Sequence, residues 1–140
     1  MPLTAEVEIT VAFHDVDVLE HVWHGHYFKY LEIARCALLQ KFDYDYPQMR
    51  ASGFMWPIVE SSIKFVQPAR YGDRLWVRGE LLEYENRIKI GYVITNTGRN
   101  HIVTKAHTVQ VAVDIASGEL QFVSPPILFE KLKQACGTLP

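Results

Sequence analysis

The chain has 140 residues, a length that suits one domain with a single hydrophobic core. Hydrophobic residues make up 49% and charged residues 21% of the sequence, a balance that is typical of globular proteins and excludes the disordered class. The formal net charge of −2 gives no basic excess, so an extended nucleic-acid surface is not predicted. We therefore expect one domain over residues 1–140 and no nucleic-acid partner.

The N-terminus shows no charged leader followed by an apolar stretch, and no apolar run approaches the roughly 18 residues of a membrane span. We therefore expect a cytoplasmic protein with no membrane partner. Cys36 and Cys136 lie far apart and outside any Cys-x-x-Cys spacing, so neither a disulfide framework nor a zinc ribbon is expected.

The first part of the chain predicts a strand, a loop and a helix. Residues 6–13 alternate between apolar and polar side chains, which is the period of a half-buried strand. Residues 14–24 break this pattern and form a polar, histidine-bearing loop. Residues 25 to about 42 predict a helix with one wide apolar face. Pro47 and its neighbours end the helix, and a looser segment is expected up to Met55.

The rest of the chain is predominantly strand. Alternation predicts strands over 58–65, 75–81, 88–94 and 102–113, with turns at 68–73, 85–86 and 96–100. A short strand over 119–123 and a terminal helix over 127–135 are also expected. One strand, one long helix and four or five antiparallel strands predict the α+β class, with the helix packed on a curved sheet.

The loop between the first strand and the helix concentrates groups that can do chemistry: Asp15, Asp17, His21, His24 and His26. It precedes a helix N-terminus, where unpaired N–H groups and the helix dipole favour negative charge. A carboxylate beside such donors can attack a thioester carbonyl or activate water against it, while the donors stabilise the charge on the carbonyl oxygen. The histidines show no recognised metal-ligand spacing, so no metal is expected.

Other charged residues have ordinary structural interpretations beside functional ones. Asp17 taken alone could be a loop or capping carboxylate, and Asp15 is interpreted as structural support. Glu60 is expected to pair with Lys64 at most, with a second catalytic carboxylate as the alternative. Six basic residues could either grip nucleotide phosphates or form a solvated sheet edge: Arg70, Arg74, Arg78, Arg87, Lys89 and Arg99.

Two motifs carry a resemblance to a known family. Asp17, Val22, His24 and Tyr27 stand in Asp-x-x-x-x-Val-x-His-x-x-Tyr spacing, which resembles the signature loop of the 4-hydroxybenzoyl-CoA thioesterase family. The segment from Ile63 to Leu75 resembles that family's strand, Pro-Ala-Arg turn and Gly-Asp-x-Leu entry to the next strand. The motifs occur in the family's order, and the resemblance covers nearly the whole chain.

The resemblance implies a hotdog fold, in which a curved antiparallel sheet wraps a long central helix. Subunits of this family pair by joining sheets and have active sites at the subunit interface, so a homodimer or homotetramer is implied. The implied activity is hydrolysis of an acyl-CoA, with no cofactor because coenzyme A is part of the substrate. The alternative is a hotdog protein that binds acyl thioesters, or acts on acyl-carrier-protein thioesters, without efficient acyl-CoA hydrolysis.

The resemblance also implies roles for four residues. Asp17 is the implied nucleophile or general base. The backbone N–H groups near His24 and Gly25 would polarise the thioester carbonyl, and His24 and Tyr27 would shape the site. Family members often have glycine in the middle of this loop, where the present chain has Leu19-Glu20-His21.

Overall fold

The structure is a computed structural model that describes residues 2–140. Its helices are α1 (Tyr27–Lys41), α2 (Tyr46–Ala51) and α3 (Pro126–Cys136). Its strands are β1 (Thr4–Thr10), β2 (Phe54–Met55), β3 (Ile58–Phe65), β4 (Arg74–Glu83), β5 (Ile88–Asn96), β6 (His101–Gln110) and β7 (Val113–Asp114). Two short 3-10 turns, η1 (Phe13–Asp15) and η2 (His24–His26), lie between β1 and α1.

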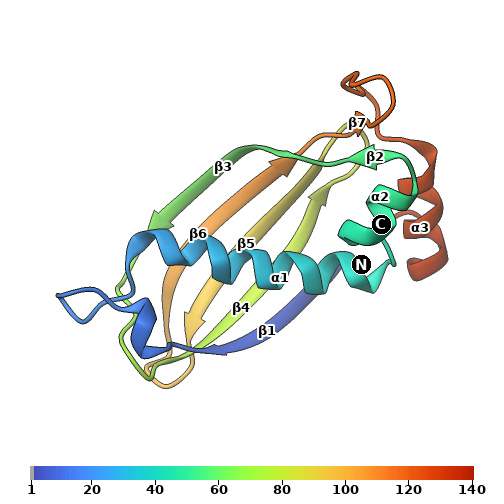
Figure 1. Cartoon of the computed structure of the whole chain (residues 1–140). Coiled ribbons are helices and arrows are strands. Elements are labelled where there is room, and N and C mark those ends of the chain that lie inside the picture. The colour runs from blue at the N-terminus through green and yellow to red at the C-terminus, as the bar shows by residue number, and fades with distance from the viewer. Residues whose placement is uncertain (1) are drawn as a thin grey trace.

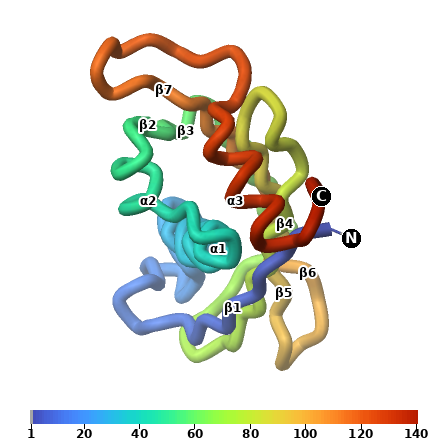
Figure 2. The backbone as a smooth tube through the Cα atoms, turned by 90° about the vertical axis from the view of Figure 1, so that its right-hand side faces the viewer, coloured from blue at the N-terminus to red at the C-terminus, as the bar shows by residue number. Residues whose placement is uncertain are grey.

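A five-stranded antiparallel sheet forms the body of the molecule, in the order β1-β4-β5-β6-β3. The sheet curves around α1, as Figure 1 shows from the side and Figure 2 shows in a view nearly along the helix. β2 and β7 form a separate two-stranded sheet at one end. The predicted α+β architecture of a long helix on a curved antiparallel sheet is confirmed.

The core forms between α1 and the inner face of the sheet. α1 turns one apolar face inward, and its buried residues recur at helical spacing: Tyr27, Tyr30, Leu31, Ala34, Leu38 and Leu39. β5 buries every second residue against this face, from Ile88 to Ile94. Each large apolar side chain that is fully buried contributes about 1.5–3 kcal/mol, so this contact holds α1 against the sheet.

Several boundaries differ from those predicted. β1 ends at Thr10; Val11 still donates its N–H to the Asp73 carbonyl, and the chain then turns into η1. α1 begins at Tyr27 after η2, two residues later than expected. The predicted strand over 119–123 is wrong, since this segment makes only an isolated bridge through Leu120.

The segment after α1 is helical where a looser conformation was predicted. Asp45 caps α2 through a capping box with Gln48, and Pro47 stands in the first turn, where a missing N–H costs nothing. The Asp-x-x-Gln spacing and the proline were both visible in the sequence. Pro47 therefore marks the start of α2, whereas α1 already ends at Lys41.

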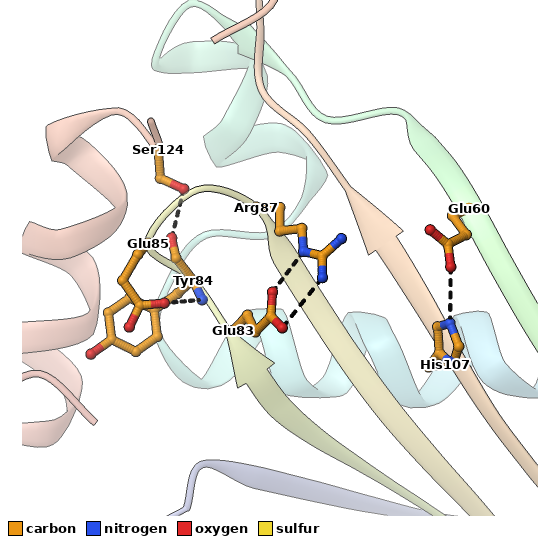
Figure 3. Close-up of polar contacts among 7 residues, drawn as sticks. All are labelled: Glu60, Glu83, Tyr84, Glu85, Arg87, His107 and Ser124. Atoms are coloured by element: carbon orange, nitrogen blue, oxygen red, sulfur yellow. Dashed lines mark hydrogen bonds and ion pairs between the residues drawn. The ribbon is translucent and has the colours of Figure 1, made fainter. Parts of the chain in front are cut away.

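Polar contacts fasten the end of the sheet opposite the loop between β1 and α1 (Figure 3). Ser124, just before α3, donates to the Tyr84 carbonyl at 2.6 Å and joins the terminal helix to the β4–β5 turn. Glu60 lies 3.3 Å from His107 on β6, and the expectation that it pairs with Lys64 is wrong. The two side chains point to the same face across neighbouring strands.

Candidate active site

A cavity of about 400 Å³ lies beside the loop that joins β1 to α1. Three segments line it: the loop, the start of α1 and the chain leaving β3. The lining residues are Asp17, His21, Val22, His24, Tyr27, Phe65, Val66, Gln67 and Pro68. The fold therefore brings the candidates Asp17, His24 and Tyr27 to one cavity and adds a wall from residues 65–68.

The loop forms a tight hairpin that presents Asp17. Asp17 donates its N–H to the His21 carbonyl at 2.8 Å, and its own carbonyl accepts the Glu20 N–H at 2.9 Å. Glu20 has a φ of 64°, the left-handed conformation that completes such three-residue hairpins and that favours glycine. Within the stretch Leu19-Glu20-His21, Glu20 is thus the residue with a glycine-like conformation.

The carboxylate of Asp17 is anchored through one oxygen. Its Oδ1 accepts the Leu19 N–H at 2.9 Å and the His21 N–H at 3.4 Å. Its Oδ2 has no hydrogen-bond partner within residues 2–140. One oxygen orients the group while the other remains available to a water or a carbonyl carbon.

The N-terminus of the helical segment, just after the loop that carries Asp17, offers backbone N–H donors. Neither His24 nor Gly25 donates its N–H to an acceptor in the described part of the chain. Gly25 itself does not line the cavity. A Cβ at this position would overlap the indole ring of Trp23, so the glycine allows that ring to cover the helix start.

Tyr27 joins α1 to the opposite wall of the cavity. Its hydroxyl accepts the N–H of Ala69 at 3.2 Å, and its ring packs against Phe65 with centroids 5.4 Å apart. Burial raises the pKa of Tyr27, so the phenol stays neutral. His24 lies nearer the surface, between the rings of Trp23 and Phe65.

Asp15 points away from the cavity into the protein and is 3% exposed. It accepts hydrogen bonds from Tyr30 at 2.7 Å and from the Lys29 ammonium at 2.5 Å. Burial alone would raise the pKa of Asp15, but these two donors lower it below its ordinary value. The geometry agrees with the interpretation of Asp15 as structural support, because the two carboxylates have separate partners.

The structure separates the six basic residues that were candidates for phosphate binding. Arg87 pairs with Glu83 at 2.6 Å, and Arg78 lies within ion-pair distance of Glu6 and Glu80. Arg70 and Arg99 line a second cavity near the loop.

No group of three or more His, Cys, Asp or Glu side chains in residues 2–140 is arranged to hold a metal ion. Within the same range, no helix has the length and apolar character needed to cross a bilayer.

Comparisons with known proteins extend over most of the chain. "Putative acyl-CoA thioesterase YneP" of Bacillus subtilis is 28% identical over 125 residues, which cover 89% of this chain and 86% of that protein. Long-chain acyl-CoA thioesterase FadM of Escherichia coli is 27% identical over 130 residues, covering 92% and 97% of the two chains.

The fold is shared with solved thioesterases. The 1,4-dihydroxy-2-naphthoyl-CoA thioesterase Slr0204 from Synechocystis superposes with a TM-score of 0.81 at 22% identity, covering 94% of each chain. The predicted hotdog fold is thus confirmed. The family described as the thioesterase-like superfamily matches residues 11–135, which is a broader group than the one the two motifs resembled. This match agrees with the prediction of a thioester-hydrolysing enzyme, and the chain belongs to the thioesterase-like superfamily.

Proposed function

We propose that this chain hydrolyses acyl-CoA thioesters to a free carboxylic acid and coenzyme A, as a single domain over residues 1–140. The observation that carries the proposal is the Asp17 carboxylate, which lines the cavity with one oxygen anchored and one free. The similarity to YneP and FadM, both named as acyl-CoA thioesterases, supports the choice of substrate class.

Asp17 acts as the general base or the nucleophile. As a base, it takes a proton from water while the water oxygen attacks the thioester carbonyl. The C–S bond then breaks, and Asp17 returns the proton to the departing thiolate to give the free thiol of coenzyme A. As a nucleophile, its free oxygen attacks the carbonyl carbon, and the C–S bond breaks to release the coenzyme A thiolate, which takes a proton from water. Water then hydrolyses the mixed anhydride to the free acid and restores the Asp17 carboxylate. In both routes the N–H groups of His24 and Gly25 stabilise the negative carbonyl oxygen.

His24 and Tyr27 position the acyl group in this proposal. Tyr27 is held by Ala69 and stays neutral, so it supplies a fixed polar wall and takes no part as a base. The chemistry requires a carboxylate, backbone donors and water, so we propose that no metal or cofactor takes part.

We further propose that the active unit is at least a homodimer formed through β3. β3 is an edge strand, and none of its residues is buried. Exposed apolar side chains lie on it and just beyond it, with Val59 57% exposed and Phe65 49% exposed. An edge of this kind pairs readily with a second strand, and pairing here would cover the open side of the cavity wall at residues 65–68.

A thiol-release assay tests the proposed activity. Aromatic and long-chain acyl-CoAs, together with the same acyl groups on an acyl carrier protein, would be offered to the purified chain. Turnover of acyl-CoAs is expected. Release from the carrier protein alone, or tight binding of acyl-CoA without release, would instead support the carrier-protein or binding alternatives.

Asp17→Asn tests the assigned carboxylate. The variant keeps the shape of the side chain but removes the anion, and kcat should fall at least about a hundred-fold, the lower range for general-base assistance. Binding of a nonhydrolysable acyl-CoA should change less. Asp15→Asn is the matched control and should lose less turnover. Near-normal kcat in a folded Asp17→Asn variant would contradict the mechanism.

A further inference from the structure

A second cavity of about 310 Å³ lies across the loop hairpin from the candidate active site. Along the hairpin, Val16 and Glu20 line this second cavity, whereas Asp17 and His21 line the first. The remaining wall comes from η1, the turn before β4 and the β5–β6 turn: Phe13, Arg70, Tyr71, Asp73 and Arg99. Figure 1 shows these turns at the same end of the sheet as the loop.

The two arginine-bearing turns are locked together by side chains. Asp73 Oδ2 accepts the Arg70 N–H at 2.9 Å and the Asn96 side-chain amide at 2.9 Å. The Asn96 side chain, in a residue that is 1% exposed, in turn accepts the Arg99 N–H at 3.1 Å through its carbonyl oxygen. Because Asp73 and Asn96 hold both backbones, Arg70 and Arg99 extend from fixed positions.

Neither arginine is neutralised by a partner. Arg70 and Arg99 form no ion pair with any carboxylate in residues 2–140, in contrast to Arg87, which Glu83 holds. Two carboxylates also line the cavity: Asp73 accepts two N–H donors through Oδ2, and Glu20 is exposed to solvent, but neither lies within ion-pair distance of Arg70 or Arg99 in residues 2–140. Two guanidinium groups at one cavity are suited to phosphate oxygens.

An aromatic surface borders the arginines. Phe13 and Tyr71 form an edge-to-face pair with centroids 5.6 Å apart, and the two residues are 74% and 62% exposed. Exposed aromatic faces stack with nucleobases regardless of base identity. Cations with a neighbouring aromatic surface match a phosphorylated nucleoside better than they match an isolated anion.

We propose that the second cavity binds the adenosine 3′-phosphate 5′-diphosphate end of coenzyme A, an inference that rests on the proposed acyl-CoA thioesterase function. Arg70 and Arg99 contact the phosphates, and the Phe13–Tyr71 pair receives the adenine. The pantetheine arm crosses the hairpin tip, where Val18 is 98% exposed and Leu19 is 70% exposed, and delivers the thioester to Asp17.

The test compares two substrates that carry the same acyl group, one on coenzyme A and one on N-acetylcysteamine, which lacks the nucleotide. Arg70→Gln and Arg99→Gln should each raise KM for the acyl-CoA about five- to twenty-fold with little change in kcat. Neither should alter KM for the N-acetylcysteamine thioester. Arg50→Gln, at a surface arginine on α2, is the matched control and should leave both values unchanged.

A second test changes the charge of the cavity wall in the opposite direction. Glu20→Gln removes an anion from the cavity wall, so KM for the acyl-CoA should fall. Added salt should raise KM for the acyl-CoA in the wild type, and the Arg70→Gln/Arg99→Gln double variant should show a weaker salt dependence. A purely structural role of the arginines would affect both substrates equally and would overturn the inference.

Direct binding separates this inference from the proposed activity. Titration with adenosine 3′,5′-bisphosphate should show binding that each arginine variant weakens by a similar factor. If the chain hydrolyses neither thioester, the proposed function fails, and this titration alone decides whether the cavity binds the nucleotide. Inorganic phosphate bound as tightly as the bisphosphate, or binding unchanged in the variants, would refute a nucleotide site.

Discussion

Tyr30 donates a hydrogen bond of 2.7 Å to the buried carboxylate of Asp15 and so joins α1 to the loop that carries Asp17. The loop is tied to the same place through its backbone, because the Asp15 carbonyl accepts the Trp23 N–H at 2.9 Å. The candidate nucleophile or base, Asp17, therefore extends from a hairpin whose base is fixed on the protein interior.

Tyr30→Phe should lower the free energy of unfolding by about 1.5–3 kcal/mol, since it leaves a buried charged acceptor without one of its donors. Urea denaturation measures this change. Tyr84→Phe is the control: the Tyr84 hydroxyl donates to the Pro140 carbonyl at an exposed site, and its loss should cost about 0.5 kcal/mol or less. Equal losses in the two variants would show that the buried Tyr30–Asp15 hydrogen bond stabilises the protein no more than the exposed hydrogen bond of Tyr84 does.

Asp15 should also make stability depend on pH. Its pKa in the folded protein is lowered from the usual 3.8, so the unfolded chain binds its proton first as the pH falls. The stabilisation is complete above the unfolded pKa and is lost as the pH falls through the folded pKa. Unfolding free energies measured from about pH 6 down to pH 2 should therefore decline less steeply in Asp15→Asn than in the wild type. If the unfolding free energies of the wild type and of Asp15→Asn declined in parallel with pH, Asp15 would not be the source of this pH dependence.

Glu20→Gly should stabilise the protein by about 0.5–1 kcal/mol, because glycine adopts the left-handed φ of this position without the strain that a Cβ causes. Thermal unfolding provides the measurement. Leu19→Gly is the matched neighbour: its φ is not positive, so the added freedom of the unfolded chain should destabilise the protein by a similar amount. Changes of the same sign in both variants would contradict the strain argument.

Gly25→Ala should destabilise the protein by about 1–3 kcal/mol, the usual cost of an added methyl group that displaces a packed neighbour. The neighbour is the Trp23 ring, so Trp23→Ala should reduce the cost of Gly25→Ala. A double-mutant cycle followed by urea denaturation measures this coupling. If the free-energy changes of Gly25→Ala and Trp23→Ala were additive, the destabilisation by Gly25→Ala would not come from the Trp23 ring.

Association through β3 should be visible by sedimentation. The wild type is expected to sediment as a dimer or larger species, and Val59→Lys on the edge strand should shift it towards monomer and reduce turnover. Ile115→Lys adds the same charge at an exposed position just after β7 and should not change the sedimentation. A wild-type chain that is active as a stable monomer would refute the proposed dimer.

The sequence by itself determined the architecture and indicated three candidate site residues. Alternation located the main strands, and the apolar face from Tyr27 to Leu39 located α1, because these periods report directly which side of an element is buried. The spacing of Asp17, His24 and Tyr27 placed these candidates near one another, since all three lie on one continuous loop and helix start and line one cavity.

Only the tertiary structure decided which distant segments meet that loop. The wall at residues 65–68, the bond from Tyr30 to Asp15 and the bridge from Asp73 to Asn96 depend on the order and register of the strands. Periodicity identifies a buried face but not the neighbour that covers it, because burial depends on packing between elements far apart in the chain. The pairing of β1 with β4, and of β4 with β5, is what places the turns beside the hairpin that carries Asp17.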